Sequence, residues 1–184
     1  MSFGTARIKW LLGDAGIRWA VAAGAAVYLY TGNRTPTDLD ILVRPNDLAR
    51  VARLLGHTHK TGKATWGESL KVEVDSVEIV GSLLLKLDGT LCRYSLDDEM
   101  LSHSRTALFE RVEVPVLAPE DVIALKAVLQ RGPEQGKHDL EDIAALATRM
   151  DVDANYLRRR LRQMGAEDRA RPVLRQWGWD EQSS

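Results

Sequence analysis

Two aspartates separated by one residue, Asp38 and Asp40, have the spacing in this chain that most directly suggests chemistry. They begin a stretch in which polar and apolar residues alternate and which ends in apolar residues. This pattern predicts a strand over residues 38–43 that ends before Pro45. Residues two apart on a strand share one face at about 6.6 Å, where two ionised carboxylates repel by about 2.5 kcal/mol. A divalent cation bound between the two carboxylates would replace this repulsion with attraction. Oxygen ligands without His or Cys favour Mg²⁺ or Mn²⁺.

The segment upstream of these acids predicts a phosphate-binding turn. Residues 17–22 read as a short strand, Gly24 breaks it, and residues 25–31 are expected to form a helix. Backbone N–H groups at such a turn and at a helix N-terminus favour anions. A bare Asp-x-Asp is most often a solvated strand entrance, so the site hypothesis depends on this upstream arrangement.

The remaining periodicity predicts a meander of strands followed by helices, an α/β (α+β) chain. A first helix ends near residue 15, before Gly16, and another follows the 25–31 helix over residues 46–55. Strands are predicted over 60–66, 70–74, 77–80, 83–87, 91–94 and 110–117, with a short helix from Ser95. Helices are predicted over 119–130, 138–150, 155–164 and 168–177. We therefore expect a core over 1–118 and a C-terminal helical region over 119–184.

Composition narrows the class of protein. The 184 residues are 45% apolar and 28% charged with a net charge of −1, so the whole molecule has no strong field for nucleic acid. A single cysteine, Cys92, excludes an internal disulfide and suits a reducing cytoplasmic setting. The longest nearly uncharged run, 19–30, is shorter than the roughly 20 residues that span a bilayer, so we expect no membrane contact.

Several ordered motifs between residues 17 and 147 resemble those of one family. The stretch Val21-Ala-Ala-Gly-Ala-Ala-Val-Tyr-Leu-Tyr precedes Arg34-Thr-Pro-Thr-Asp-Leu-Asp-Ile-Leu-Val. Downstream follow Val77-Glu-Ile-Val, Pro119-Glu-Asp-Val-Ile-Ala-Leu-Lys and Lys137-His-Asp-Leu-Glu-Asp. Together they resemble the DNA polymerase beta-like nucleotidyltransferase superfamily, and within it the AbiEii-type and minimal nucleotidyltransferases. The resemblance implies a nucleotidyltransferase fold, with a mixed, mostly antiparallel sheet flanked by helices and a C-terminal helical region.

The resemblance also implies transfer of an NMP from an NTP to an acceptor hydroxyl on RNA, such as a tRNA end, on protein or on a small molecule. A role as a toxin–antitoxin component is a further implication. The implied catalytic residues and ligands of Mg²⁺ (or Mn²⁺) are Asp38, Asp40 and Glu78. The implied nucleotide-binding residues are Ala23, Gly24, Arg34, Thr37 and Lys126, with Lys137, Asp139 and Asp142 as weaker candidates.

Two residues depart from the family pattern. Ala23 stands where a glycine is usual, and Glu78 stands where an aspartate is commoner. Glu73 and Asp75 are rival third acids, because only the register of the strand hairpin decides which acid meets the Asp-x-Asp pair. These departures leave open a catalytically silent module of the same fold that binds a nucleotide or a partner.

Structural roles compete with several of the implied functions. Lys126 on an amphipathic helix is either a mobile charge for phosphate or a solvated residue, and Arg34 either lines the cleft or pairs with Asp38. Lys137 and Asp139 also suit an ordinary helix N-terminus. Residues 149–175 hold eight arginines against four acids, which suits either an RNA backbone or a solvated helix face.

Overall fold

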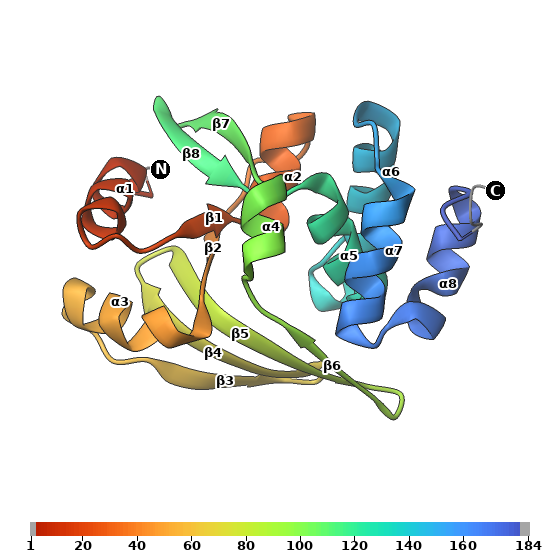
Figure 1. Cartoon of the computed structure of the whole chain (residues 1–184), viewed down its shortest axis with the longest axis horizontal. Helices are drawn as coiled ribbons and strands as arrows, with labels where there is room; N and C mark the ends of the chain where they lie inside the picture. The colour runs from red at the N-terminus through yellow and green to blue at the C-terminus, as the bar shows by residue number, and fades with distance from the viewer. Residues whose placement is uncertain (1–2, 181–184) are drawn as a thin grey trace.

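An eight-stranded mixed sheet forms the centre of the computed structural model, which describes residues 3–180 (Figure 1). The strand order is β3-β4-β5-β2-β1-β8-β7, with β6 paired to β5. The pairs β1–β8 and β2–β5 are parallel and the other pairs are antiparallel, so the predicted mixed, mostly antiparallel sheet is confirmed. The strands are β1 (Trp19–Val21), β2 (Leu39–Val43), β3 (Lys60–Ala64), β4 (Gly67–Val74), β5 (Val77–Leu87), β6 (Thr90–Tyr94), β7 (Arg105–Phe109) and β8 (Val112–Val116).

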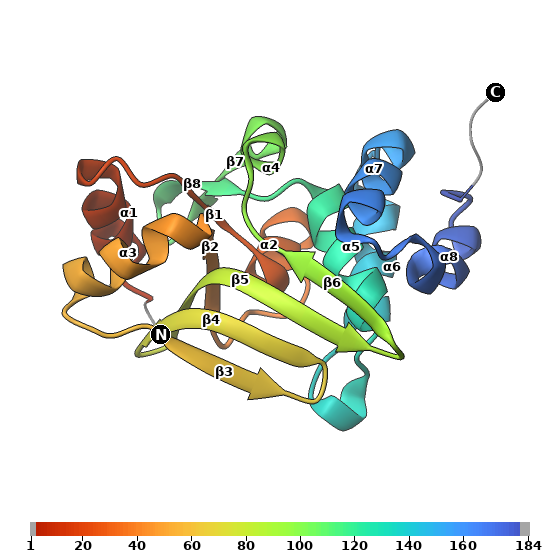
Figure 2. The same cartoon turned by 60° about the horizontal axis from the view of Figure 1, so that its bottom comes forward.

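Most of the helices gather at the two ends of this sheet (Figure 2). Helices α1 and α3 lie at one end, α5 to α8 lie at the other, and α2 and α4 lie between them. Their bounds are α1 (Thr5–Asp14), α2 (Ala23–Thr31), α3 (Leu48–Leu55), α4 (Asp98–His103), α5 (Pro119–Leu129), α6 (Asp139–Arg149), α7 (Ala154–Met164) and α8 (Glu167–Gln176). Short 3-10 turns, η1 (Pro45–Asp47) and η2 (Pro133–Gln135), precede α3 and α6.

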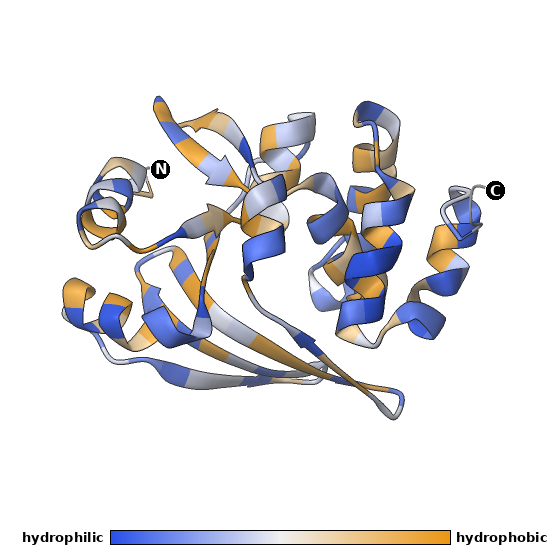
Figure 3. Cartoon of the chain, viewed as in Figure 1, coloured by the Kyte–Doolittle hydropathy of each residue, from blue (hydrophilic) through white to orange (hydrophobic). Residues whose placement is uncertain are grey.

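One continuous core joins the sheet to these helices. Strand β1 is wholly buried, and α5 is buried at every position because it packs against α2, α6, α7 and α8. In contrast, α7 has an amphipathic sequence with mostly hydrophilic residues on its visible side (Figure 3). Helix α5 therefore connects the sheet to the C-terminal helices.

Three of the predicted elements are wrong in detail. Strand β5 is one strand rather than two, since Gly81 continues the strand where its missing Cβ lets Leu48 pack closely. The predicted strand 110–117 is the second half of a hairpin, whose turn at Glu110 and Arg111 uses two left-handed residues instead of glycine. Helix α4 is capped by Asp97, which accepts a hydrogen bond from the Met100 N–H, and not by Ser95.

Every described element after β8 is a helix, as the periodicity predicts. The division into units 1–118 and 119–184 stays a prediction, and its residues 1–2 and 181–184 lie outside the described part of the chain. Trp177 and Trp179 stack on each other and pack against the core. No helix within residues 3–180 combines the length and the apolar character needed to cross a membrane.

Candidate active site

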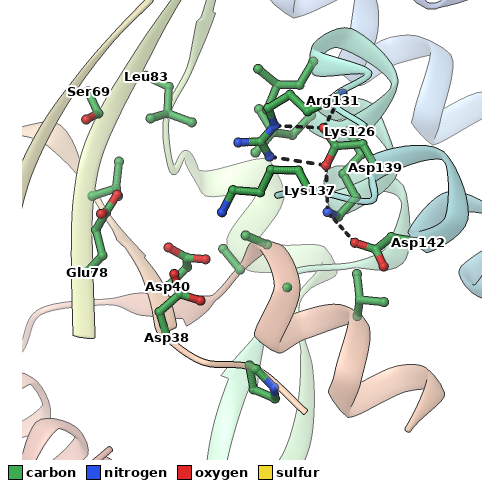
Figure 4. A pocket seen from close by; sticks show the side chains of 18 of the residues that line it. Asp38, Asp40, Ser69, Glu78, Leu83, Lys126, Arg131, Lys137, Asp139 and Asp142 are labelled. Carbon is green, nitrogen blue, oxygen red and sulfur yellow. Dashed lines mark hydrogen bonds and ion pairs between the residues drawn. The ribbon is translucent and has the colours of Figure 1, made fainter. Parts of the chain in front are cut away.

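A pocket of about 480 Å³ opens between the sheet and helices α2, α5 and α6. The carboxylates of Asp38, Asp40 and Glu78 lie on the strand side, and the helix side carries basic side chains together with Asp139 and Asp142 (Figure 4). The pocket brings together all the residues that the sequence predicts for a site: Ala23, Gly24, Arg34, Thr37, Asp38, Asp40, Glu78, Lys126, Lys137, Asp139 and Asp142. Their individual roles stay predictions.

Strand alternation directs Asp40 into the pocket. Its neighbours Leu39 and Ile41 on β2 are fully buried on the opposite face, so the intervening side chain must face the cavity. Asp38 lies just before the strand and is exposed at the pocket wall. Figure 4 shows both carboxylates on the same side of the pocket.

The register of the sheet determines which of the candidate third acids lies nearest to Asp40. Strands β2 and β5 are parallel, and Asp40 pairs directly with Glu78. Glu73 pairs with Glu78 from β4, so it lies one strand further from Asp40 and outside the pocket wall. Asp75 lies in the β4–β5 turn, where its φ is 52°. Of the three candidates, Glu78 is therefore the acid that lies beside Asp40.

The environment of Asp40 opposes its negative charge. Burial, followed by the carboxylates of Asp38 and Glu78, raises the pKa of Asp40 to about 7, whereas Lys137 and Lys126 oppose the increase. Three carboxylates that repel one another in a half-buried wall form a set of hard oxygen donors that a divalent cation would neutralise. The donor set therefore fits Mg²⁺ or Mn²⁺.

The three acids do not yet form a complete ligand group. Within residues 3–180, no three His, Cys, Asp or Glu side chains are close enough to hold a metal ion as they stand. Glu78 is instead bound by Lys71, whose Nζ lies 2.6 Å from Glu78 Oε2. Sequence reasoning missed Lys71, because a lysine in a strand carries no motif and its contact with Glu78, seven residues further along the chain, depends on how β4 pairs with β5.

The start of α2 forms the second part of the pocket. Ala23 adopts a φ of 47°, a left-handed conformation that favours glycine, so alanine forms this turn at a cost in strain. The N-cap residue, Ala22, makes no side-chain cap, so N–H groups of the first helical turn lack partners within the helix. Gly24 has open space at its Cβ position. This helix end can receive an anion.

Lys126 has a different environment from the predicted mobile charge. Its side chain is 6% exposed, and its Nζ lies 3.0 Å from Asp139 Oδ1 and 2.8 Å from Asp142 Oδ2. Arg131 also donates to Asp139, and despite burial these contacts hold the pKa of Asp139 below its ordinary value. The prediction of a mobile Lys126 is therefore wrong, because two facing carboxylates fix its ammonium.

Lys137 is the basic side chain that reaches toward the acids from the helix side of the pocket. It is exposed, extends from the helix side toward Asp40, and forms no ion pair with another described residue (Figure 4). Arg34 pairs with Glu141 and Asp142 rather than with Asp38. A positive charge without a carboxylate partner, opposite a wall of acids, is suited to bind phosphate oxygens.

The arginines of α7 are occupied within the molecule. Arg160 is 3% exposed and pairs with Asp97 and the buried Asp121. Arg159 pairs with Glu99, and Arg162 pairs with Glu167. Arg158 donates to the Trp179 carbonyl. The predicted excess of positive charge is thus largely satisfied by neighbouring groups.

The model of the family described as "Uncharacterised nucleotidyltransferase" matches residues 1–177 of this chain. The chain belongs to this family of nucleotidyltransferases. The nucleotidyltransferase superfamily expected from the motifs is confirmed, whereas the AbiEii-type subgroup stays a prediction. A search of curated proteins finds no match.

Solved structures share the fold at low sequence identity. A protein from Thermotoga maritima, described as a nucleotidyltransferase, is 17% identical with a TM-score of 0.53, over 71% of this chain and 85% of that one. The antibiotic-resistance factor ANT(2″)-Ia is 11% identical with a TM-score of 0.55, over 94% of each chain. Its complex with adenylyl-2″-tobramycin gives 12% identity and a TM-score of 0.50, over 94% and 95% of the two chains.

Proposed function

We propose that this protein transfers an NMP from an NTP to a hydroxyl group of a small acceptor molecule, with release of pyrophosphate. The observation that carries the proposal is the row of carboxylates from Asp38, Asp40 and Glu78, facing Lys137 across a pocket that begins at the N-terminus of α2. Phosphoryl-group transfer requires this combination, because negative charge on the phosphates must be bound while an acceptor hydroxyl loses its proton.

Asp38, Asp40 and Glu78 would hold the divalent cation that the family implies. When bound, Mg²⁺ or Mn²⁺ would neutralise charge on the triphosphate and lower the pKa of the acceptor hydroxyl. Lys137 would contact phosphate oxygens, and the N–H groups at Ala23 and Gly24 would orient them. Glu78 would accept the proton of the acceptor hydroxyl once it is released from its present ion pair.

Lys126 and Asp139 have a supporting role in this proposal. Their buried ion pair joins α5 to α6 and holds the loop that carries Lys137 next to the pocket. Arg34 and Thr37 line the mouth of the pocket, where Arg34 would contribute positive charge toward the nucleotide while it stays anchored to Asp142.

A small acceptor agrees best with the available surfaces. The pocket volume falls in the range of small-molecule sites, about 300 to 1,000 Å³. Binding of an RNA acceptor would need basic side chains of the protein that are free to contact the RNA phosphates. Arg159, Arg160 and Arg162 of α7 are instead paired with acids of the same chain. ANT(2″)-Ia, which shares the fold, is known in complex with an adenylylated antibiotic, which supports a small hydroxylated acceptor. The toxin–antitoxin role stays a prediction.

The test is transfer of radiolabel from each of the four α-labelled NTPs, with Mg²⁺ or Mn²⁺, to a panel of small polyhydroxylated compounds and to total RNA. We expect labelled small molecules from the wild type and none from Asp40→Asn. Asp75→Asn is the matched control, because this exposed acid lies outside the pocket wall. Equal labelling by wild type and Asp40→Asn would contradict the proposal.

The same assay separates the other possibilities. Label on RNA alone would replace the small acceptor with a nucleic acid. NTP binding without transfer to any acceptor would support the catalytically silent module that Ala23 and Glu78 leave open. Glu78→Gln and Glu68→Gln provide a second matched pair, since both acids lie on strands of the same sheet and only Glu78 lines the pocket.

A further inference from the structure

Lys71 is placed between two acids at the edge of the pocket. Its side chain is 15% exposed, and its Nζ lies 2.6 Å from Glu73 Oε1 and 2.6 Å from Glu78 Oε2. Across the sheet, Asp40, Glu78 and Glu73 form a row on neighbouring strands β2, β5 and β4. The ammonium therefore lies where the acid of the site meets the acid outside it.

The neighbouring edge strand leaves room for this lysine. A Cβ built on Gly62 of β3 would lie 2.8 Å from Lys71 Cε and 2.7 Å from Ser69 Oγ. Any larger residue at position 62 would push the lysine chain away from its present path. The placement of Lys71 thus depends on a specific gap in the wall, and not only on its own flexibility.

The two carboxylate partners of Lys71 are not equivalent. Glu73 also pairs with Lys60, whereas Lys71 is the cation that pairs with Glu78 within the described residues. Although burial alone would lower it, hydrogen bonds to both acids raise the pKa of Lys71, so the side chain is an ammonium at neutral pH. Lys71 can leave Glu78 and still keep Glu73 as its counter-ion.

We propose that Lys71 is a positioning residue that occupies the third carboxylate of the site until a divalent cation and a nucleotide bind. It then keeps its contact with Glu73 and releases Glu78 to the site. This inference rests on the proposed function, since it assumes that Asp38, Asp40 and Glu78 are the ligands. It accounts for an acid set that lines one pocket without forming a ready ligand group. Its consequence is a weak affinity for the free metal ion.

The test is a titration of the protein with Mn²⁺ in the absence of nucleotide. The electron paramagnetic resonance signal of free Mn²⁺ measures how much of the ion is bound. Lys71→Met is expected to bind Mn²⁺ about tenfold more tightly than the wild type, because the competing ammonium is gone. Lys71→Arg, which keeps the charge, should stay within about twofold of the wild type. Glu73→Gln should weaken binding, because Lys71 then has Glu78 as its remaining carboxylate. Unchanged or weaker binding by Lys71→Met would overturn the proposal.

Matched controls keep the outcomes distinct. Lys86→Met removes an exposed lysine that pairs with Glu68 on the same sheet, and it should leave Mn²⁺ affinity unchanged. In the absence of metal, Lys71→Met should have a lower melting temperature than the wild type, because the acids repel one another without the ammonium. Added Mn²⁺ should raise this melting temperature again, because it relieves the repulsion. If Lys71→Met does not fold, Glu73→Gln decides, and its unchanged or tighter binding overturns the proposal.

Failure of this inference differs from failure of the proposed function. Tighter Mn²⁺ binding by Lys71→Met without NMP transfer by the wild type would retain the role of Lys71 and remove the transferase activity. NMP transfer by the wild type together with an unchanged Mn²⁺ affinity in Lys71→Met would retain the transferase activity and remove the proposed role of Lys71.

Discussion

Replacing Ala23 with glycine is expected to stabilise the protein, although most changes at a pocket wall do the opposite. Ala23 begins α2 with a φ of 47°. The left-handed conformation costs an L-residue about 1 to 2 kcal/mol, and glycine avoids this cost. Glycine also loses about 0.5 to 1 kcal/mol more conformational entropy on folding, so the net gain is about 0.5 to 1 kcal/mol. For a chain of this length, the melting temperature should rise by about 1 to 4 °C.

Urea unfolding and thermal unfolding of Ala23→Gly measure this gain. Ala145→Gly is the matched control, because Ala145 lies in the interior of α6 and is not among the residues with positive φ. That change should lower the free energy of unfolding by about 0.5 to 1 kcal/mol, since glycine is a poor helix former. The reasoning is refuted if both substitutions destabilise the protein to the same extent.

Three other predictions concern charged groups. Because burial and neighbouring carboxylates raise the pKa of Asp40 to about 7, above its unfolded value, the wild type loses stability as the pH rises from about 4 to 7. Asp40→Asn should therefore raise the free energy of unfolding by about 1 to 2 kcal/mol at pH 8 and hardly at pH 4, and equal urea curves at pH 8 would contradict this. Arg160→Met should lower the free energy of unfolding by about 3 to 5 kcal/mol, because it removes the ion-pair partner of the buried Asp121 carboxylate. Arg162→Met at the surface should lower it by under about 1 kcal/mol. Similar losses for the two variants on urea unfolding would disprove the distinction. Lys137→Met should weaken NTP binding about tenfold in calorimetry with little effect on the free energy of unfolding. Lys126→Met should mainly lower the free energy of unfolding, because it removes a buried ion pair. Weaker NTP binding in Lys126→Met and lower stability in Lys137→Met would contradict these roles.

The third acid shows where sequence reasoning ends. Alternation along the chain identifies Glu73, Asp75 and Glu78 as candidates, but their distances from Asp40 depend on pairing between strands. The β4–β5 ladder shifts register between Leu70 and Lys71, and no local pattern in the sequence signals this irregularity. The parallel pairing of β2 with β5 places Glu78, and neither of the other two acids, directly beside Asp40.

The C-terminal helices were predicted to within one or two residues because their periodicity and their Gly and Asp boundaries are local signals. Strand β7 was missed because its residues 105–109 are mostly exposed and lack alternation. The ion pairs of Lys126 could not be predicted either, since they depend on how α5 packs against α6. Local patterns thus identified most elements, and long-range packing determined what the charged residues do.

The central claim, that Asp38, Asp40 and Glu78 bind the cation of a nucleotide complex, can be tested by anomalous diffraction from crystals grown with Mn²⁺ and a non-hydrolysable NTP analogue. We expect a manganese peak within about 2.5 Å of oxygens from all three side chains, with Lys71 turned to Glu73 and phosphate oxygens near Lys137. A nucleotide bound elsewhere, or manganese without contact to Asp40, would contradict the account.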